Sequence, residues 1–185
     1  MRRKAMIFFV GGQVCFFGGL AVCIALRPEG LGANGGISYY GVFVDTLPFY
    51  LISLLGTAAF SLLAAKLIVL LDLRPLRYGL LAFALLTTVV ALTPYIISTP
   101  LDWLHTIAGI IAFVVQFTLS FWLLAKLQWT GWASLFVVLE IATGAFSLVY
   151  VLPSHGFLIQ SQMSFQLAFG ALIFYSFRKL LPEDA

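Results

Sequence analysis

An acidic side chain, Glu140, stands in the middle of a long apolar segment, LFVVLEIATGAF at 135–146. A carboxyl group at the centre of a bilayer costs at least about 2.5 kcal/mol on insertion scales, so we expect it to face protein or water and to be protonated or hydrogen-bonded. Thr143 and Ser147 follow on the same side of the expected helix and form a polar stripe with it. This pattern indicates a proton or cation site, or a polar anchor for a lipid or ligand headgroup. The alternative is a buried acid that ties two helices together.

Three glutamines are expected near the depth of this acid. Gln116 shares a helical face with Ser120, while Gln13 and Gln166 fall near the middle of the first and last apolar segments. These positions predict a polar layer inside a helix bundle, made of Gln13, Gln116, Glu140 and Gln166. The alternative is that each glutamine hydrogen-bonds separately to a nearby backbone carbonyl.

A second polar group is expected where several apolar segments end on one side of the membrane, and it consists of Asp45, Asp102, His105 and His155. Histidine and carboxylate are ligands that zinc accepts, and a free coordination position would hold a water for hydrolysis. The alternative is that Asp102 caps the start of its helix and that His105, one turn later, pairs with it.

These side chains must be positioned by six segments that are long and apolar enough to cross a bilayer, which needs roughly 20 residues at about 1.5 Å each. We place the segments at 6–26, 47–70, 78–98, 103–126, 132–152 and 158–177. Proline and glycine mark most of the breaks between them. The sequence therefore predicts an all-α, polytopic membrane protein with six transmembrane helices in one bundle, and a single domain over residues 1–185.

The distribution of basic residues predicts the orientation. Nine of the ten Lys and Arg residues lie on the side of the N-terminus, and Arg27 is the exception. Cytoplasmic loops carry an excess of Lys and Arg, so we expect both termini in the cytoplasm. The predicted location is the cell membrane, as a multi-pass protein of the bacterial inner membrane.

The longest connection between segments, residues 27–46, carries five closely spaced glycines and the adjacent tyrosines Tyr39 and Tyr40. Connections of this length either have a function or are flexible linkers. The sequence leaves two alternatives open, a flexible connector and a folded cap over the outer mouth of the bundle.

Composition excludes several classes of protein. Hydrophobic residues make up 62% of the chain and charged residues only 9%, whereas soluble domains are about 25% charged. A soluble enzyme, a disordered chain and a nucleic-acid-binding domain are therefore excluded. The formal net charge of +3 follows from the cytoplasmic basic residues. We expect membrane lipids as partners, and self-association or membership of a larger membrane complex.

Together these features predict a transport, ligand- or lipid-binding, or assembly subunit with an interior polar site around Glu140 and without a cofactor. The alternative function is a zinc-dependent lipid hydrolase of the outer leaflet, which would use Asp45, His105 and His155.

Two short motifs carry a resemblance to known families: Gly-Ile-Ser-Tyr-Tyr-Gly at 36–41 and Asp-Trp-Leu-His at 102–105. With six short spans, they resemble a family of small bacterial six-helix integral membrane proteins of unknown function. This resemblance covers most of the chain and implies a multi-pass inner-membrane protein. More distantly, the chain resembles the membrane hydrolases grouped with alkaline ceramidases and adiponectin receptors. That likeness implies a zinc site in which the family's Ser, Asp and His roles fall to Ser38, Asp45, His105 and His155.

Overall fold

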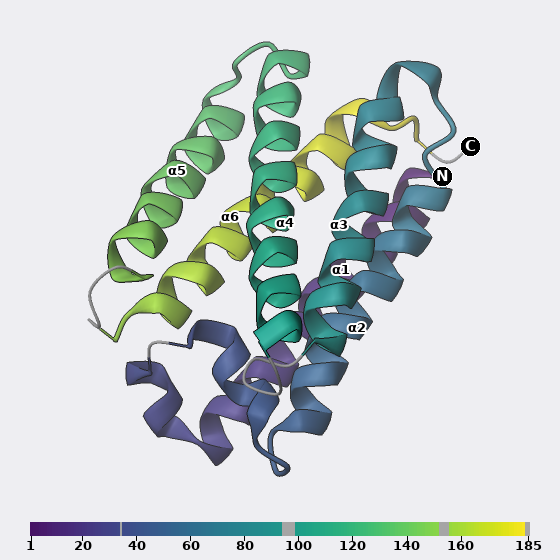
Figure 1. Ribbon diagram of the computed structural model, residues 1–185. Coiled ribbons are helices and arrows are strands. Elements are labelled where there is room, and N and C mark those ends of the chain that lie inside the picture. Colours follow the sequence, from purple (N-terminus) through teal and green to yellow (C-terminus); the bar gives the residue numbers. More distant parts are fainter. Residues whose placement is uncertain (34, 94–98, 152–155, 184–185) are drawn as a thin grey trace.

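The computed structural model describes residues 1–33, 35–93, 99–151 and 156–183, and within these ranges every regular element is a helix (Figure 1). The α-helices are α1 (Arg2–Leu26), α2 (Leu47–Lys66), α3 (Arg74–Leu92), α4 (Thr99–Lys126), α5 (Gly131–Val151) and α6 (Leu158–Leu180). The prediction of an all-α chain is therefore confirmed.

Among the described residues, four stretches are long and apolar enough to cross a membrane: α1, α2, Leu71–Leu92, which contains α3, and Pro100–Lys126 in α4. In α5 the described side chains form a shorter apolar stretch, Gly131–Ser147. The first half of α6 contains three glutamines, which lower its hydropathy. These helices support the prediction of a membrane protein.

The two ends of the bundle differ in what they carry. Both termini, the α2–α3 connection and the α4–α5 turn lie at one end, which we call the termini end; residues 27–46 lie at the other, the loop end (Figure 1). At the termini end, Arg2 donates to the carbonyl oxygen of Arg178 at 3.1 Å and forms an ion pair with Glu183. Lys126 pairs with Asp72 at 3.2 Å. These contacts join the chain ends and the two connections of that end.

Several helix boundaries differ from the predicted ones, and proline explains two of them. The second helix ends at Lys66 rather than at residue 70, and Leu71–Leu73 forms a short 3₁₀ helix, η3. The third begins at Arg74 rather than 78, because Pro75 occupies its first turn, where the missing N–H of proline costs nothing. The fourth begins at Thr99 rather than 103, with Pro100 as its second residue. From the sequence, proline at such a break was expected only to separate two segments.

Helices that follow one another in sequence pack side by side: α1 with α2, α2 with α3, α3 with α4, and α5 with α6. Contacts of α4 with α5, and of α6 with α1 and α4, attach the α5–α6 hairpin to the other four helices. In Figure 1, α6 runs obliquely behind α4, from the loop end of α5 towards the termini. The last helix is thus the element that brings α5 and α1 into one bundle.

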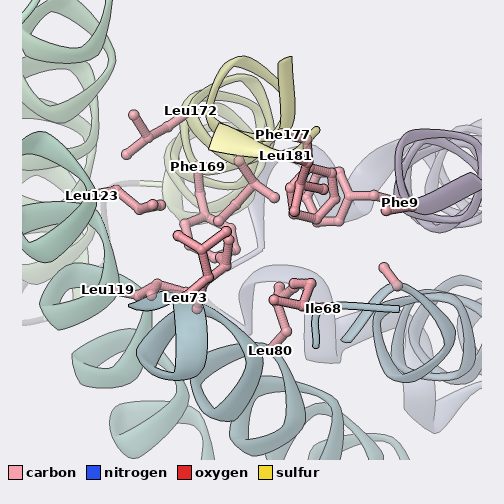
Figure 2. Packing of buried hydrophobic residues seen from close by; sticks show 14 of the residues in the cluster. Phe9, Ile68, Leu73, Leu80, Leu119, Leu123, Phe169, Leu172, Phe177 and Leu181 are labelled. Atoms are coloured by element: carbon pink, nitrogen blue, oxygen red, sulfur yellow. The ribbon is translucent and has the colours of Figure 1, made fainter. Parts of the chain in front are cut away.

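The bundle has two apolar cores, one near each end. The termini-end core draws residues from all six α-helices, including Phe9, Ala64, Leu80, Leu123, Val137 and Phe177. Figure 2 shows its aromatic and leucine side chains packed between the helices. The loop-end core consists of Phe16, Leu20, Cys23, Tyr40, Tyr50, Leu54, Ala91 and Ile159.

A close seam joins α1 to α2. Ser53 and Thr57 are fully buried on α2 and donate to α1 carbonyl oxygens, Ser53 to Phe16 at 2.8 Å and Thr57 to Gly12 at 3.0 Å. At Gly19, an added Cβ would lie 2.6 Å from the carbonyl oxygen of Phe49. Small residues of this kind allow membrane helices to approach closely.

Residues 27–46 form a folded cap that contains two 3₁₀ helices, η1 (Pro28–Gly32) and η2 (Gly36–Val42). Two glutamines of α6 hold it: Gln162 accepts from the backbone N–H of Ile37 at 2.9 Å, and Gln160 donates to the carbonyl oxygen of Leu31 at 3.0 Å. Tyr40 is fully buried, and burial raises the pKa of its phenol to about 12. Of the two alternatives for this segment, the structure shows the cap.

The seam generates a test with a control at the adjacent residue. We expect Gly19→Ala to lower the free energy of unfolding by about 1–3 kcal/mol, because overpacking forces backbone to shift. A Cβ at Gly18 would meet nothing within 4 Å, so Gly18→Ala should leave stability unchanged or raise it by up to about 1 kcal/mol. Unfolding in mixed micelles titrated with dodecyl sulfate measures both. Equal stability of the two variants would contradict the close seam.

Candidate functional site

The interior polar site is built around Glu140, which lies in the middle of α5 and is fully buried. Ser120 of α4 is also fully buried, and its hydroxyl donates to Oε1 of the acid at 3.0 Å. The second carboxyl oxygen, Oε2, is buried without a hydrogen-bond partner in the described part of the chain. The side chain of Glu140 therefore points into the protein, and its hydrogen-bond partner among the described residues is the neutral hydroxyl of Ser120.

A second polar contact lies one turn away along α4. Gln116 donates through Nε2 to Oε1 of Gln166 on α6 at 2.8 Å, and both side chains are buried. Because Gln116 and Ser120 are four residues apart, they share one face of α4. That face thus makes one polar contact with α5 and another with α6. The amide nitrogen of Gln166 is itself buried without a partner among the described residues.

Gln13 does not join these contacts. Its amide oxygen lies so close to α6 that a Cβ added at Gly170 would be 2.8 Å from it. Neither amide atom has a hydrogen-bond partner among the residues described. Instead of one connected layer, the structure shows two bonded pairs, Ser120–Glu140 and Gln116–Gln166, with Gln13 apart from both.

The polar stripe beyond Glu140 joins α5 to α6. The carbonyl oxygen of Thr143 accepts from Ser161 of α6 at 2.7 Å and from Ser147 at 3.2 Å. The two serines also hydrogen-bond to each other. The hydroxyl of Thr143 donates within its own helix, to Leu139 at 2.7 Å. These residues therefore fix the α5–α6 hairpin that carries the acid.

A shallow groove of about 300 Å³ runs between α1 and α6. Its lining is apolar except for Gln13, and it includes Val10, Phe17, Gly170 and Phe174. Glu140 is not part of this lining. The groove thus reaches the isolated glutamine and not the acid.

At the loop end, Asp45 is engaged by a cation. Arg27 donates through Nε to both oxygens of this carboxylate at 3.0 Å, and it also pairs with Glu29 at 3.4 Å. The hydrogen bond from Arg27 lowers the pKa of Asp45. The pair closes the cap, because Arg27 and Asp45 stand at its two ends.

His105 is buried at the loop end of α4 and contacts two other segments. Its Nε2 lies 2.7 Å from the hydroxyl of Ser38 in the cap, and its Nδ1 lies 2.6 Å from the carbonyl oxygen of Thr93. Asp102 stands one turn before it, in the first turn of α4. In the described ranges, His, Cys, Asp and Glu form no group of three or more that could hold a metal. His155 lies outside those ranges, so the four-residue zinc site stays a prediction.

Three of these partners were not assigned from the sequence: Ser120 for Glu140, Ser161 for Thr143 and Ser147, and Thr93 for His105. Ser120 had a signal, because it follows Gln116 by one helical turn on the same face. Thr93 contributes a backbone oxygen, which residue type does not reveal.

Comparison of the chain with protein-family models, curated proteins and solved structures finds no match. Both family resemblances therefore stay predictions from the motifs.

The amide pair generates a double-mutant test. We expect Gln116→Leu and Gln166→Leu to be coupled by about 0.6–1.7 kcal/mol in unfolding free energy, the range measured for hydrogen bonds between membrane helices. Gln13→Leu is the matched control: it has no recorded hydrogen bond to either residue, so its effect should add to that of Gln116→Leu within about 0.5 kcal/mol. Additivity of the first pair would contradict the contact.

Proposed function

We propose that the chain is a six-span protein of the bacterial inner membrane with both termini in the cytoplasm. Helices of 21 residues in α5 and 23 in α6 are long enough to cross about 30 Å of hydrocarbon. The basic residues support the orientation, because all except Arg27 fall on elements whose bounds place them at the termini end (Figure 1). An excess of Lys and Arg marks the cytoplasmic side.

Within that topology, the function that the geometry favours is a transport or ligand-binding subunit whose site is Glu140. The observation that carries this proposal is a fully buried carboxyl with one oxygen bonded to Ser120 and the other without a partner in the described chain. A purely structural acid would be expected to use both oxygens, since each buried polar atom left unpaired costs about 1–3 kcal/mol. Oε2 is the atom that we assign to the ligand.

The ligand that best fits this atom is a proton. A bare carboxylate in apolar surroundings is costly unless a cation or several donors compensate it, and the recorded partner is a single hydroxyl. A protonated carboxyl is neutral and therefore needs fewer compensating partners than a carboxylate. One of its oxygens accepts from Ser120, and the other carries the hydrogen. Binding and release of that proton would change the charge inside the bundle, which is what a proton-coupled carrier requires.

The partners proposed for the chain are membrane lipids and further copies of itself. The groove between α1 and α6 supports the lipid proposal, because it is apolar and open along the side of two helices. The alternative to a transport or ligand-binding function is a structural subunit of a larger membrane complex. In that case the polar pairs would only hold the helices together.

Two substitutions at the acid separate these functions. In liposomes with an imposed membrane potential and an internal pH dye, we expect wild-type protein to carry protons. Glu140→Gln should lower this flux at least about tenfold, because the amide keeps a hydrogen-bond acceptor for Ser120 but does not exchange a proton. Its unfolding free energy should fall by less than about 1.5 kcal/mol.

Ser120→Ala should slow the flux less than Glu140→Gln does, since the carboxyl remains. Ser176→Ala is its control, because this buried serine donates within α6 to Leu172 at 2.7 Å. If Glu140→Leu keeps both wild-type flux and wild-type stability, the acid is not a functional site.

A further inference from the structure

The contacts of His105 form a chain of hydrogen bonds through three segments. Ser38 lies in η2 of the cap, and His105 lies in α4. Thr93, which contributes its carbonyl oxygen, is the residue that follows α3. Ser38 Oγ is 2.7 Å from His105 Nε2, and His105 Nδ1 is 2.6 Å from the Thr93 oxygen. Both distances are those of good hydrogen bonds.

The carbonyl oxygen fixes the tautomer of the neutral imidazole. An oxygen of this kind only accepts, so the hydrogen must be on Nδ1. Nε2 then carries the lone pair, and the hydroxyl of Ser38 donates to it. This is the arrangement that activates a serine: a nucleophile bonded to a base whose orientation is set by a third group.

The loop end of α2 also carries a buried hydroxyl. Tyr50 of α2 donates to the carbonyl oxygen of Val90 in α3 at 3.4 Å. Ser38 itself is half-buried, whereas His105 and Tyr50 are buried.

The cap holds the serine against the bundle from both sides. The N–H of Ile37, the residue before Ser38, is fixed to Gln162 of α6, and Arg27 is fixed to Asp45 where the cap begins and ends. Nucleophile and base are thus held by separate rigid contacts, as a preorganised site requires.

We propose that Ser38 and His105 form a nucleophile–base pair that transfers the acyl group of a carboxylic ester at the loop end. Because the cap lies at the end of membrane-crossing helices, the ester class assigned to it is an acyl ester of a membrane lipid. This activity is separate from the proposed function of Glu140 and does not depend on it.

The steps balance without a co-reactant other than water. Ser38 Oγ attacks the ester carbonyl carbon while its proton moves to His105 Nε2. The bond from that carbon to the alcohol oxygen then breaks, and the proton on Nε2 passes to the departing alkoxide. Water repeats the sequence on the acyl-serine, with His105 taking its proton, and releases a carboxylic acid and free Ser38.

The test uses full-length protein in phospholipid vesicles and an alkyl fluorophosphonate, which forms a stable bond to activated serines. Mass spectrometry should find the adduct on Ser38. Ser38→Ala should lose this adduct, and His105→Asn should slow its formation at least about 100-fold, because general-base catalysis contributes about that much or more. Ser134→Ala is the control: Ser134 is also half-buried, but it lies at the termini end.

His105→Gln is the second variant if His105→Asn does not fold, as judged by gel filtration and circular dichroism; it should slow labelling at least about 100-fold. Hydrolysis of p-nitrophenyl octanoate should be lost in Ser38→Ala. Labelling should persist in a chelator, which separates this chemistry from zinc hydrolysis. Folded wild-type protein without an adduct on Ser38, or a folded His105→Asn or His105→Gln variant labelled at the wild-type rate, would overturn the proposal.

Discussion

The structure depends on one constraint: a polar group buried among apolar helices must find its partner inside the bundle. Water does not compensate it there, so each unpaired group costs several kcal/mol. The described chain meets this constraint at several places through contacts that each join two helices, whereas both amide atoms of Gln13 and the amide nitrogen of Gln166 have no partner among the described residues. Ser53 and Thr57 tie α2 to α1, Ser161 ties α6 to α5, and Gln116 ties α4 to α6. Glu140 is the group with the largest cost, and Ser120 compensates only one of its oxygens. The remaining oxygen is the reason to assign a function to it.

The helix α4 contributes residues to both proposed sites and keeps them apart. Its middle carries Gln116 and Ser120, and its loop end carries His105. From Ser120 to His105 the helix rises over fifteen residues, about 22 Å, so neither centre contacts the other. The first lies among the helices of the bundle, and the second lies where α4 meets the cap and the end of α3. A proton site and an acyl-transfer site on the same chain are therefore independent claims.

Much of this could be predicted from residue type and order. Apolar length and proline predicted the helices, and the position of Glu140 in an apolar segment predicted that its side chain is buried inside the protein. The helices α3 and α4 begin about a turn before the predicted spans, because proline both ends one helix and fits the first turn of the next. The single layer of Gln13, Gln116, Glu140 and Gln166 was not predictable in detail, because depth follows from sequence whereas the rotation and crossing of helices do not. The oblique course of α6 brings Gln166 to Gln116 and leaves Gln13 against Gly170. The contacts of His105 required knowledge that the cap folds back onto α4.

The state of the interior carboxyl is the most direct test of the central claim that the bundle holds Glu140 as a compensated, protonatable group. Infrared difference spectroscopy of wild-type protein against Glu140→Gln, in membranes at neutral pH, measures whether the Glu140 carboxyl is protonated. It does not require a known transported substrate. The account predicts a carboxylic-acid C=O band that is present in the wild type, absent in Glu140→Gln and shifted in Ser120→Ala, which lacks the hydrogen bond to Oε1. A wild-type spectrum in which Glu140 contributes only a carboxylate band, unaffected by the loss of Ser120, would contradict it.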